Sequence, residues 1–278
     1  MEQDMTQAQR LDYLTEAFIQ DSEEYKNLSL PAGDEEKRTL LRSLMNIRMP
    51  APIPPEVLQV QDEYLRERNK EKGIVRAQDI PTVSEQGSHY PFGDKISIWQ
   101  GDITRLAADA IVNAANSQML GCFVPMHACI DNCIHTYAGV ELRAECDRQM
   151  QKLRSQYGEN YEQPTAVPML TGGYNLPASH VIHIVGPIVT YRLTSKLEKD
   201  LSDCYLRVLD LCAENGFKSV AFCCLSTGVF RFPNRKACEI AVQTVTDWLS
   251  AHSGAVERVI FNVFKEIDLR LYEEMLLS

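Results

Sequence analysis

Apolar residues recur at helical spacing through the first seventy residues of the chain. In residues 5–20 they fall on one helical face, at Leu11, Leu14, Phe18 and Ile19. Residues 34–48 repeat the pattern, and Asp34 suits a cap or a first-turn position. A proline-rich run at 50–55 then breaks the chain, and Pro54-Pro55-Glu56 opens a third amphipathic helix. These helices match no catalytic motif, so they either pack as a cap on the main domain or bind a partner. We favour packing.

From Lys95 the pattern changes to alternating strands and helices. Strands are expected at 95–99, 109–114, 165–170, 180–185, 219–224 and 257–263, and helices at 129–137, 141–157, 195–215, 234–252 and 267–277. Strands such as AIVNA and RVIFNVF are almost continuously apolar, which is typical of a sheet covered on both faces. Residues 73–93 contain proline and glycine breakers and are expected to be irregular. The sequence predicts an α/β three-layer sandwich at 91–278 and an N-terminal helical extension at 1–90 packed on it.

Composition narrows the function classes. The formal net charge of −10 argues against nonspecific nucleic-acid binding, although backbone N–H groups still allow a small anionic ligand. Nine cysteines, an odd number, all lie from residue 122 onward and mostly in apolar segments, which argues against a secreted disulfide framework. No apolar run is long enough to span a membrane, and the polar start MEQDMTQAQR does not resemble a signal peptide. We therefore expect a cytoplasmic protein that does not bind membranes.

One short connection carries a candidate metal site. Cys122, His127 and Cys129 form a C-x4-H-x-C cluster directly after a predicted buried strand. Zinc prefers thiolate sulfur and imidazole nitrogen, and three protein ligands leave a fourth position open, as in catalytic sites. A structural site would need a fourth protein ligand, for which Cys133 is the nearby candidate. The alternative is that the cysteines are small buried hydrophobic residues and His127 is merely a neighbour.

Six motifs, in this order, resemble the macrodomain family of ADP-ribose binders. They are GDIT, DAIVNAAN, DNCIH-x2-AG-x-EL, GGYNLP, VIHIVGP and STGVFRFP, and they cover roughly residues 90–278. Where an ordinary macrodomain has a glycine-rich run, this chain has GCFVPMHACIDN, which resembles the zinc-containing branch that removes ADP-ribose from proteins. The resemblance implies a macrodomain fold with a mixed central sheet and a Zn²⁺ cofactor held by the three residues of the cluster.

The resemblance also implies an adenine site. Asp102 corresponds to the aspartate that reads the adenine amino group, Ile103 lies beside the ring, and Phe264 matches the aromatic residue that stacks on it. Read without the resemblance, Asp102 is equally suited to cap a turn. Phe261 is three residues from Phe264 on the same strand, so it points to the opposite side and is expected in the core.

The remaining site residues follow other strands. By resemblance, Asn116 bonds the distal ribose and Asp131 is the catalytic aspartate, although Asp131 also suits a helix cap and both roles can be filled at once. The loop at 226–230 is expected to cradle the diphosphate with backbone N–H groups, with Gly228 allowing a tight turn, unless it is an ordinary strand–helix loop. Its members are Ser226, Thr227, Gly228, Val229 and Phe230.

These features together predict a zinc-assisted protein mono-ADP-ribosyl hydrolase. The metal would polarise an oxygen of the distal ribose or of a carbonyl, or lower the pKa of a bound water, and Asp131 would orient or deprotonate the nucleophile. Family resemblance suggests a protein substrate related to lipoylated glycine-cleavage H-like carriers. Two alternatives remain: a non-catalytic reader of ADP-ribose, and a hydrolase of small derivatives such as O-acetyl-ADP-ribose.

Overall fold

The computed structural model describes residues 5–278, and their backbone divides into two compact units. The first unit holds the chain up to Gly73, together with Leu120–Glu159 and Tyr174–Leu176. The second unit holds Ile74–Met119, Asn160–Gly173 and Pro177–Ser278. The predicted domain boundary between residues 90 and 91 stays a prediction.

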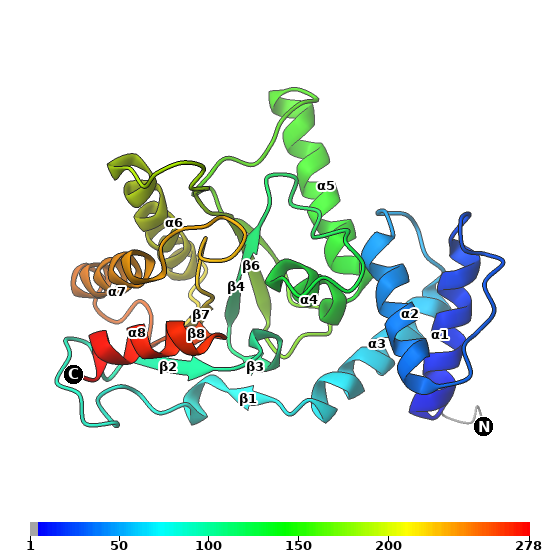
Figure 1. The fold of residues 1–278 in the computed structure, drawn as a ribbon, viewed down its shortest axis with the longest axis horizontal. Coiled ribbons are helices and arrows are strands. Elements are labelled where there is room, and N and C mark those ends of the chain that lie inside the picture. Colours follow the sequence, from blue (N-terminus) through cyan, green and yellow to red (C-terminus); the bar gives the residue numbers. More distant parts are fainter. Residues whose placement is uncertain (1–4) are drawn as a thin grey trace. The chain divides into compact units, whose positions relative to one another are not determined.

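The first unit is helical. It contains α1 (Gln7–Asp21), α2 (Asp34–Ile47), α3 (Pro55–Glu71), α4 (Ile130–Ala138) and α5 (Val140–Tyr157). Helix α1 packs on both α2 and α3, and both of these also contact α4 (Figure 1). The apolar faces of the three N-terminal helices form its buried cluster: Leu11, Leu14, Phe18, Ile19, Leu41, Leu44, Met45, Val57, Tyr64 and Leu65. The N-terminal helices therefore share one compact unit with the helix that follows the cysteine–histidine cluster.

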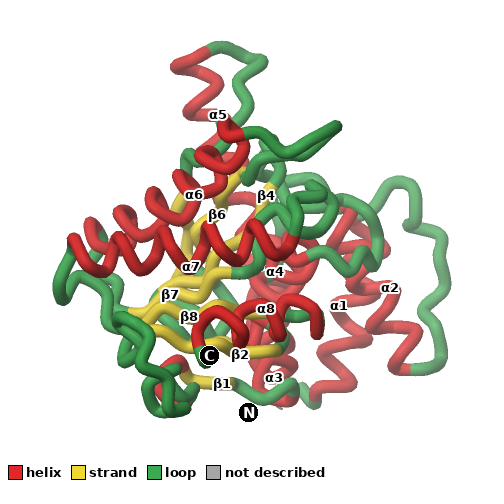
Figure 2. The backbone as a smooth tube through the Cα atoms, turned by 60° about the vertical axis from the view of Figure 1, so that its left-hand side comes forward, coloured by secondary structure: helices red, strands yellow, loops and turns green. Residues whose placement is uncertain are grey.

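The second unit is built on a six-stranded sheet with the order β2-β8-β7-β4-β6-β5 (Figure 2). The strands are β2 (Ile96–Gln100), β4 (Ala110–Ala115), β5 (Met169–Gly172), β6 (His180–Val185), β7 (Ser219–Phe222) and β8 (Arg258–Val263). Only the edge strand β5 is antiparallel to its neighbour, so the sheet is mixed, as predicted. The carboxyl ends of the parallel strands meet at one edge, where open α/β sheets bind ligands.

Three helices accompany this sheet in the second unit: α6 (Ser195–Glu214), α7 (Asn234–Ala251) and α8 (Glu266–Leu276). Helix α7 packs between α6 and α8, and α8 also contacts β2 and β8. Their bounds lie within one residue of those predicted. None of the helices in residues 5–278 combines the length and the apolar character that crossing a bilayer requires.

Two expectations need correction. The strand expected at 165–170 is β5 at Met169–Gly172, because Pro164 and Pro168 cannot donate to a sheet ladder and pairing begins only after the second proline. The segment 73–93 is not wholly irregular. It contains β1 (Val75–Arg76), which pairs in parallel with β3 (Leu106–Ala107), and the short 3-10 helix η1 (Ala77–Asp79). Elements of two or three residues leave no periodicity to detect.

Candidate functional site

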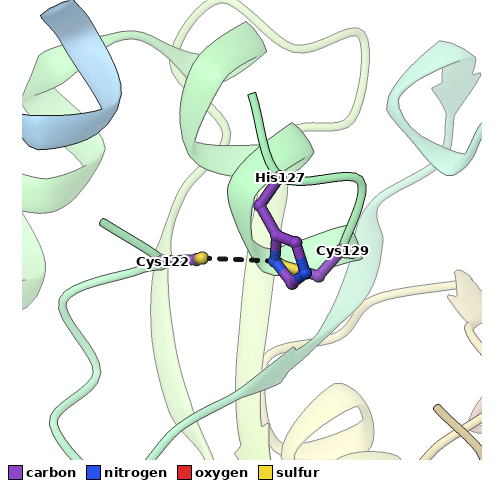
Figure 3. A group of neighbouring side chains, drawn as sticks. All are labelled: Cys122, His127 and Cys129. Carbon is purple, nitrogen blue, oxygen red and sulfur yellow. Dashed lines mark hydrogen bonds between the residues drawn. The ribbon is translucent and has the colours of Figure 1, made fainter. Parts of the chain in front are cut away.

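The cysteine–histidine cluster forms a compact group of metal-type donors in the first unit (Figure 3). The donor atoms of Cys122, His127 and Cys129 all lie within 4.8 Å of one another, and Cys122 Sγ lies 3.4 Å from His127 Nδ1. Two ligands of a tetrahedral zinc ion, one sulfur and one nitrogen, stand about 3.5 Å apart given the usual bond lengths. All three side chains are half-buried. The donor set and its spacing therefore fit zinc.

Local backbone geometry explains how the loop brings these donors together. Gly121 has a φ of +81°, and a Cβ there would lie 2.8 Å from the His135 ring, so glycine is required at this position. Met126, directly before His127, has a φ of +58°, which non-glycine residues rarely adopt. The loop turns at these two points, and the turns bring the side chain of His127 close to that of Cys122.

Cys129 is both a candidate ligand and the N-cap of α4. Its Sγ accepts a hydrogen bond from Asn132 N at 3.4 Å. Burial raises the pKa of Cys129 to about 12, so without a cation the thiol keeps its proton at neutral pH. Cation binding would displace that proton. The cap position was considered for Asp131 in the sequence, but the structure gives it to Cys129.

Cys133 does not belong to the group of three donors. Its Sγ accepts from Arg42 Nη2 at 3.7 Å. In residues 5–278 the donor group at this loop consists of three residues, Cys122, His127 and Cys129. A tetrahedral zinc ion bound by these three would keep its fourth position for a ligand from outside the group.

Asp131 lies in the first turn of α4 and is 5% exposed. Its Oδ1 is 3.6 Å from His135 Nε2, one helical turn away. Asp131 therefore lies at the helix end where the partial charge of the backbone is positive. The cluster and Asp131 are thus joined by one short stretch of backbone.

Sequence reasoning missed two side chains that hold this loop. Asn132 donates from Nδ2 to the carbonyls of Cys122 at 3.3 Å and Val124 at 3.0 Å. Arg143 in α5 donates from Nε to Leu120 O at 2.8 Å, and its guanidinium stacks over a phenylalanine ring of the same loop. Burial lowers the pKa of Arg143 to about 10, so it stays charged at neutral pH. No spacing rule connects these residues with the cluster.

The other predicted site residues follow the carboxyl ends of four adjacent parallel strands in the second unit. Asp102 and Ile103 come after β2, Phe264 after β8, the loop 226–230 after β7, and Asn116 after β4. Since these strands are neighbours in the sheet, all of these residues belong to one edge. The structure therefore places these residues of the second unit at one edge of its sheet.

At the end of β2, Asp102 caps a turn, which was the alternative to its role in adenine binding. Its Oδ1 accepts from Thr104 N at 3.0 Å and from Thr104 Oγ1 at 2.6 Å, and it caps the 3-10 helix η2 (Ile103–Arg105). Ile103 is buried. Phe264 is 76% exposed, whereas Phe261 is 1% exposed and packs on Tyr272, as expected for a core residue.

The loop 226–230 turns back on itself. Ser226 has a φ of +62°, and its carbonyl accepts from Phe232 N at 2.9 Å. Gly228 does not have a positive φ, so the tight turn predicted there comes instead from the left-handed residues Ser226 and Arg231. A Cβ at Gly228 would meet no atom within 4 Å, so its backbone is open to approach.

At the β4 end, Asn116 is half-buried and its Oδ1 accepts from Gln118 N at 3.0 Å. Within the sheet, Asn113 Nδ2 contacts His183 Nδ1 at 3.0 Å. His183 Nε2 lies 3.0 Å from Thr171 Oγ1, and burial lowers the pKa of His183 to about 3. His183 is therefore a neutral residue of the core.

Comparisons with known proteins were consistent with the motifs. A family model described as Macro domain matches residues 112–241. A protein-ADP-ribose hydrolase of Treponema medium is 46% identical and spans 98% of this chain and 100% of its own length. A protein of the same name from Staphylococcus aureus (strain MSSA476) is 41% identical over 95% of this chain and 94% of its own.

Solved structures share the fold. The macrodomain of Trypanosoma brucei in complex with ADP-ribose has a TM-score of 0.63 at 29% identity, covering 84% of this chain and 94% of that one. The macrodomain of Oceanobacillus iheyensis with ADP has a TM-score of 0.57 at 34% identity, covering 67% of this chain and 92% of that one. These neighbours and the mixed sheet confirm the predicted three-layer α/β/α class.

Proposed function

The chain belongs to the macro domain family, and from that premise we propose that it is a zinc-assisted protein-ADP-ribose hydrolase. Relatives with that name are 41–46% identical to it over nearly the full length of both chains. The observation that supports the metal-assisted form is the group of two thiols and one imidazole within 4.8 Å, followed two residues later by the buried carboxylate of Asp131.

The proposed substrate is a protein that carries single ADP-ribose units. Phe264 is a largely exposed aromatic side chain after β8, and Asp102 follows the neighbouring strand β2. Phe264 is proposed to stack on adenine, and Asp102 is proposed to accept from its amino group. The open backbone around Gly228 would bind the diphosphate through N–H groups, which requires no lysine or arginine in an acidic protein. Asn116 would bond the distal ribose.

Zinc bound by Cys122, His127 and Cys129 would supply a Lewis acid that polarises an oxygen of the substrate or lowers the pKa of a water. Asp131 is proposed to orient the attacking water and to take its proton, since a carboxylate in the first turn of a helix is stabilised in its ionised form. The bond broken joins the anomeric carbon of ADP-ribose to the modified side chain, and water supplies the new hydroxyl.

The physiological substrate and the location are further parts of this proposal. The resemblance to the zinc-containing branch supports a carrier related to the lipoylated glycine-cleavage H protein. A cytoplasmic location is supported by the odd number of cysteines, all of them free thiols in the structure.

A turnover assay on two substrate classes tests the proposed reaction. The chain is incubated with a mono-ADP-ribosylated protein and, separately, with O-acetyl-ADP-ribose, and release of free ADP-ribose is followed by chromatography. We expect multiple turnovers on the modified protein. Tight binding of ADP-ribose without turnover on several linkage types would instead identify a reader, and turnover confined to the small derivative would identify a metabolite hydrolase.

A further inference from the structure

Helix α2 of the N-terminal extension reaches the candidate metal loop with two polar side chains. Arg42 Nη2 donates to His127 O at 3.1 Å, and Asn46 Oδ1 accepts from Met126 N at 3.0 Å. These two backbone groups belong to the candidate ligand His127 and to the residue before it. The contacts span 85 and 80 positions of sequence and lie within the first compact unit.

The arrangement follows from the two faces of α2. Leu41, Leu44 and Met45 are buried in the apolar cluster with α1 and α3. Arg42 and Asn46 stand four residues apart, so they project from a common face of the helix. The apolar face therefore fixes the helix, and the polar face is free to hold the loop.

Both side chains are also tied to α4. Arg42 Nη2 donates to Asn132 Oδ1 at 2.9 Å, and Asn46 Nδ2 donates to Thr136 Oγ1 at 2.9 Å. Asn132 in turn donates to the carbonyl of Cys122, and its backbone N–H bonds Cys129 Sγ. Through Asn132, Arg42 is connected to both cysteines of the cluster as well as to His127.

Because these side chains are buried, loss of one of the contacts is costly. Asn46 is 1% exposed and Asn132 is 0% exposed, so a lost partner would leave a buried polar group unpaired. Met126 has a left-handed backbone with a φ of +58°, and its N–H is the group that Asn46 holds. A residue in this region of φ needs neighbouring contacts to keep it there.

We propose that Arg42 and Asn46 are positioning residues for the metal centre, and that the N-terminal helices serve to fix the geometry of the ligand loop. This inference rests on the proposed function, since it requires that the loop bind zinc. Partners that orient ligating residues typically contribute about 10- to 100-fold to metal affinity.

The test measures zinc affinity of the full-length chain by competition with a chromophoric chelator, and ligand geometry by the visible absorption of the cobalt(II) form. Asn46→Ala and Arg42→Gln are compared with Asn69→Ala. Asn69 is a matched control because it is a buried asparagine of the same helical unit, 2% exposed, whose Nδ2 holds Asn175 O at 2.7 Å instead of the metal loop.

We expect Asn46→Ala and Arg42→Gln to weaken zinc binding by about 10- to 100-fold and to shift the cobalt bands. Asn69→Ala should stay within twofold of the wild type in zinc affinity, even where its thermal stability falls. Arg42 is only half-buried, so Arg42→Gln should disturb folding less than Asn46→Ala. It therefore tests the inference even where Asn46→Ala does not fold.

Three other outcomes would overturn the inference. Wild-type affinity and cobalt bands in both α2 variants would show that the contacts do not position the ligands. Equal weakening in all three variants would show general destabilisation of the helical unit. Failure of the wild type to bind one equivalent of zinc would refute the metal part of the proposed function. This outcome is distinct from a failure of the inference, because it is measured on the wild type before any variant is compared.

Discussion

The two groups of candidate site residues, one in each compact unit, are organised by different means. In the second unit, Asp102, Asn116, Phe264 and the loop after β7 follow the ends of neighbouring parallel strands, so the sheet itself collects them. In the first unit, a loop with left-handed residues is held by side chains of α2, α4 and α5. A sheet edge gathers its residues through backbone pairing, whereas this loop depends on particular distant side chains.

This comparison predicts that changes in the loop and changes at the sheet edge have separable effects. The loop variants should affect metal content and turnover, and the sheet-edge variants should affect nucleotide affinity. A loop variant that lost only nucleotide affinity, or a sheet-edge variant that lost its metal, would contradict this separation.

The largest effect is expected from Cys122→Ala. It removes one of three donors, so stoichiometric zinc and turnover should both be lost, while affinity for ADP-ribose changes by only a few-fold. Metal content by mass spectrometry and calorimetric titration with ADP-ribose check this. Cys238→Ala is the control, because Cys238 lies in α7 of the second unit and outside the donor group. Retained stoichiometric zinc in Cys122→Ala would count against the ligand assignment.

Asp131→Asn should lower kcat by about 10²- to 10⁴-fold, the usual contribution of a general base, with zinc retained. Glu141→Gln is a suitable control because Glu141 is also an acid in the first turn of a helix, α5, and has no proposed role. Steady-state kinetics on the modified protein measure both. A kcat for Asp131→Asn within threefold of the wild type would remove Asp131 from the chemistry.

At the sheet edge, Phe264→Ala should weaken binding of ADP-ribose by about 5- to 150-fold, since stacking of a base on an aromatic ring is worth roughly 1–3 kcal/mol. Zinc content should not change. The matched control is Ile267→Ala, which also removes an exposed apolar side chain, 55% exposed, three residues later. Equal affinity of both variants and the wild type would refute the stacking role.

The smallest expected effect is the pH dependence of the folding stability, which arises from His183 in the sheet. Unfolded histidine titrates near 6.5, whereas burial lowers the pKa of His183 to about 3, so below pH 6.5 the unfolded state binds a proton that the folded state does not. The stabilising contribution is therefore full above pH 6.5 and decreases as the pH falls, by up to about 1.4 kcal/mol per pH unit.

Urea unfolding between pH 7.5 and 5 should show this decrease in the wild type and a weaker one in His183→Gln. Identical slopes in the two proteins would mean that His183 titrates normally in the folded state.

The sequence predicted the sheet edge better than the loop for a physical reason. Period-two and apolar patterns locate strands, and parallel strands put their carboxyl ends together, so the places of Asn116 and Phe264 followed from local signals. The donors of the loop were also visible as a C-x4-H-x-C spacing.

What the sequence did not reveal depends on distant contacts. The bonds from Arg42 and Asn46 join residues 80 or more positions apart, and a helical stripe identifies only the apolar face of α2. Likewise, nothing local distinguished Gly228 from Ser226 as the left-handed residue of its loop, because a positive φ at a serine is imposed by its surroundings.

The most direct test of metal-assisted hydrolysis is the release of ADP-ribose from a mono-ADP-ribosylated protein before and after removal of zinc with a strong chelator. Circular dichroism should show that the fold is intact, and a second aliquot should be reloaded with zinc. Loss of turnover on removal and recovery on reloading is the result we predict. Turnover that persists after the metal content has fallen to a negligible level would contradict the account and leave the chemistry to Asp131 and water alone.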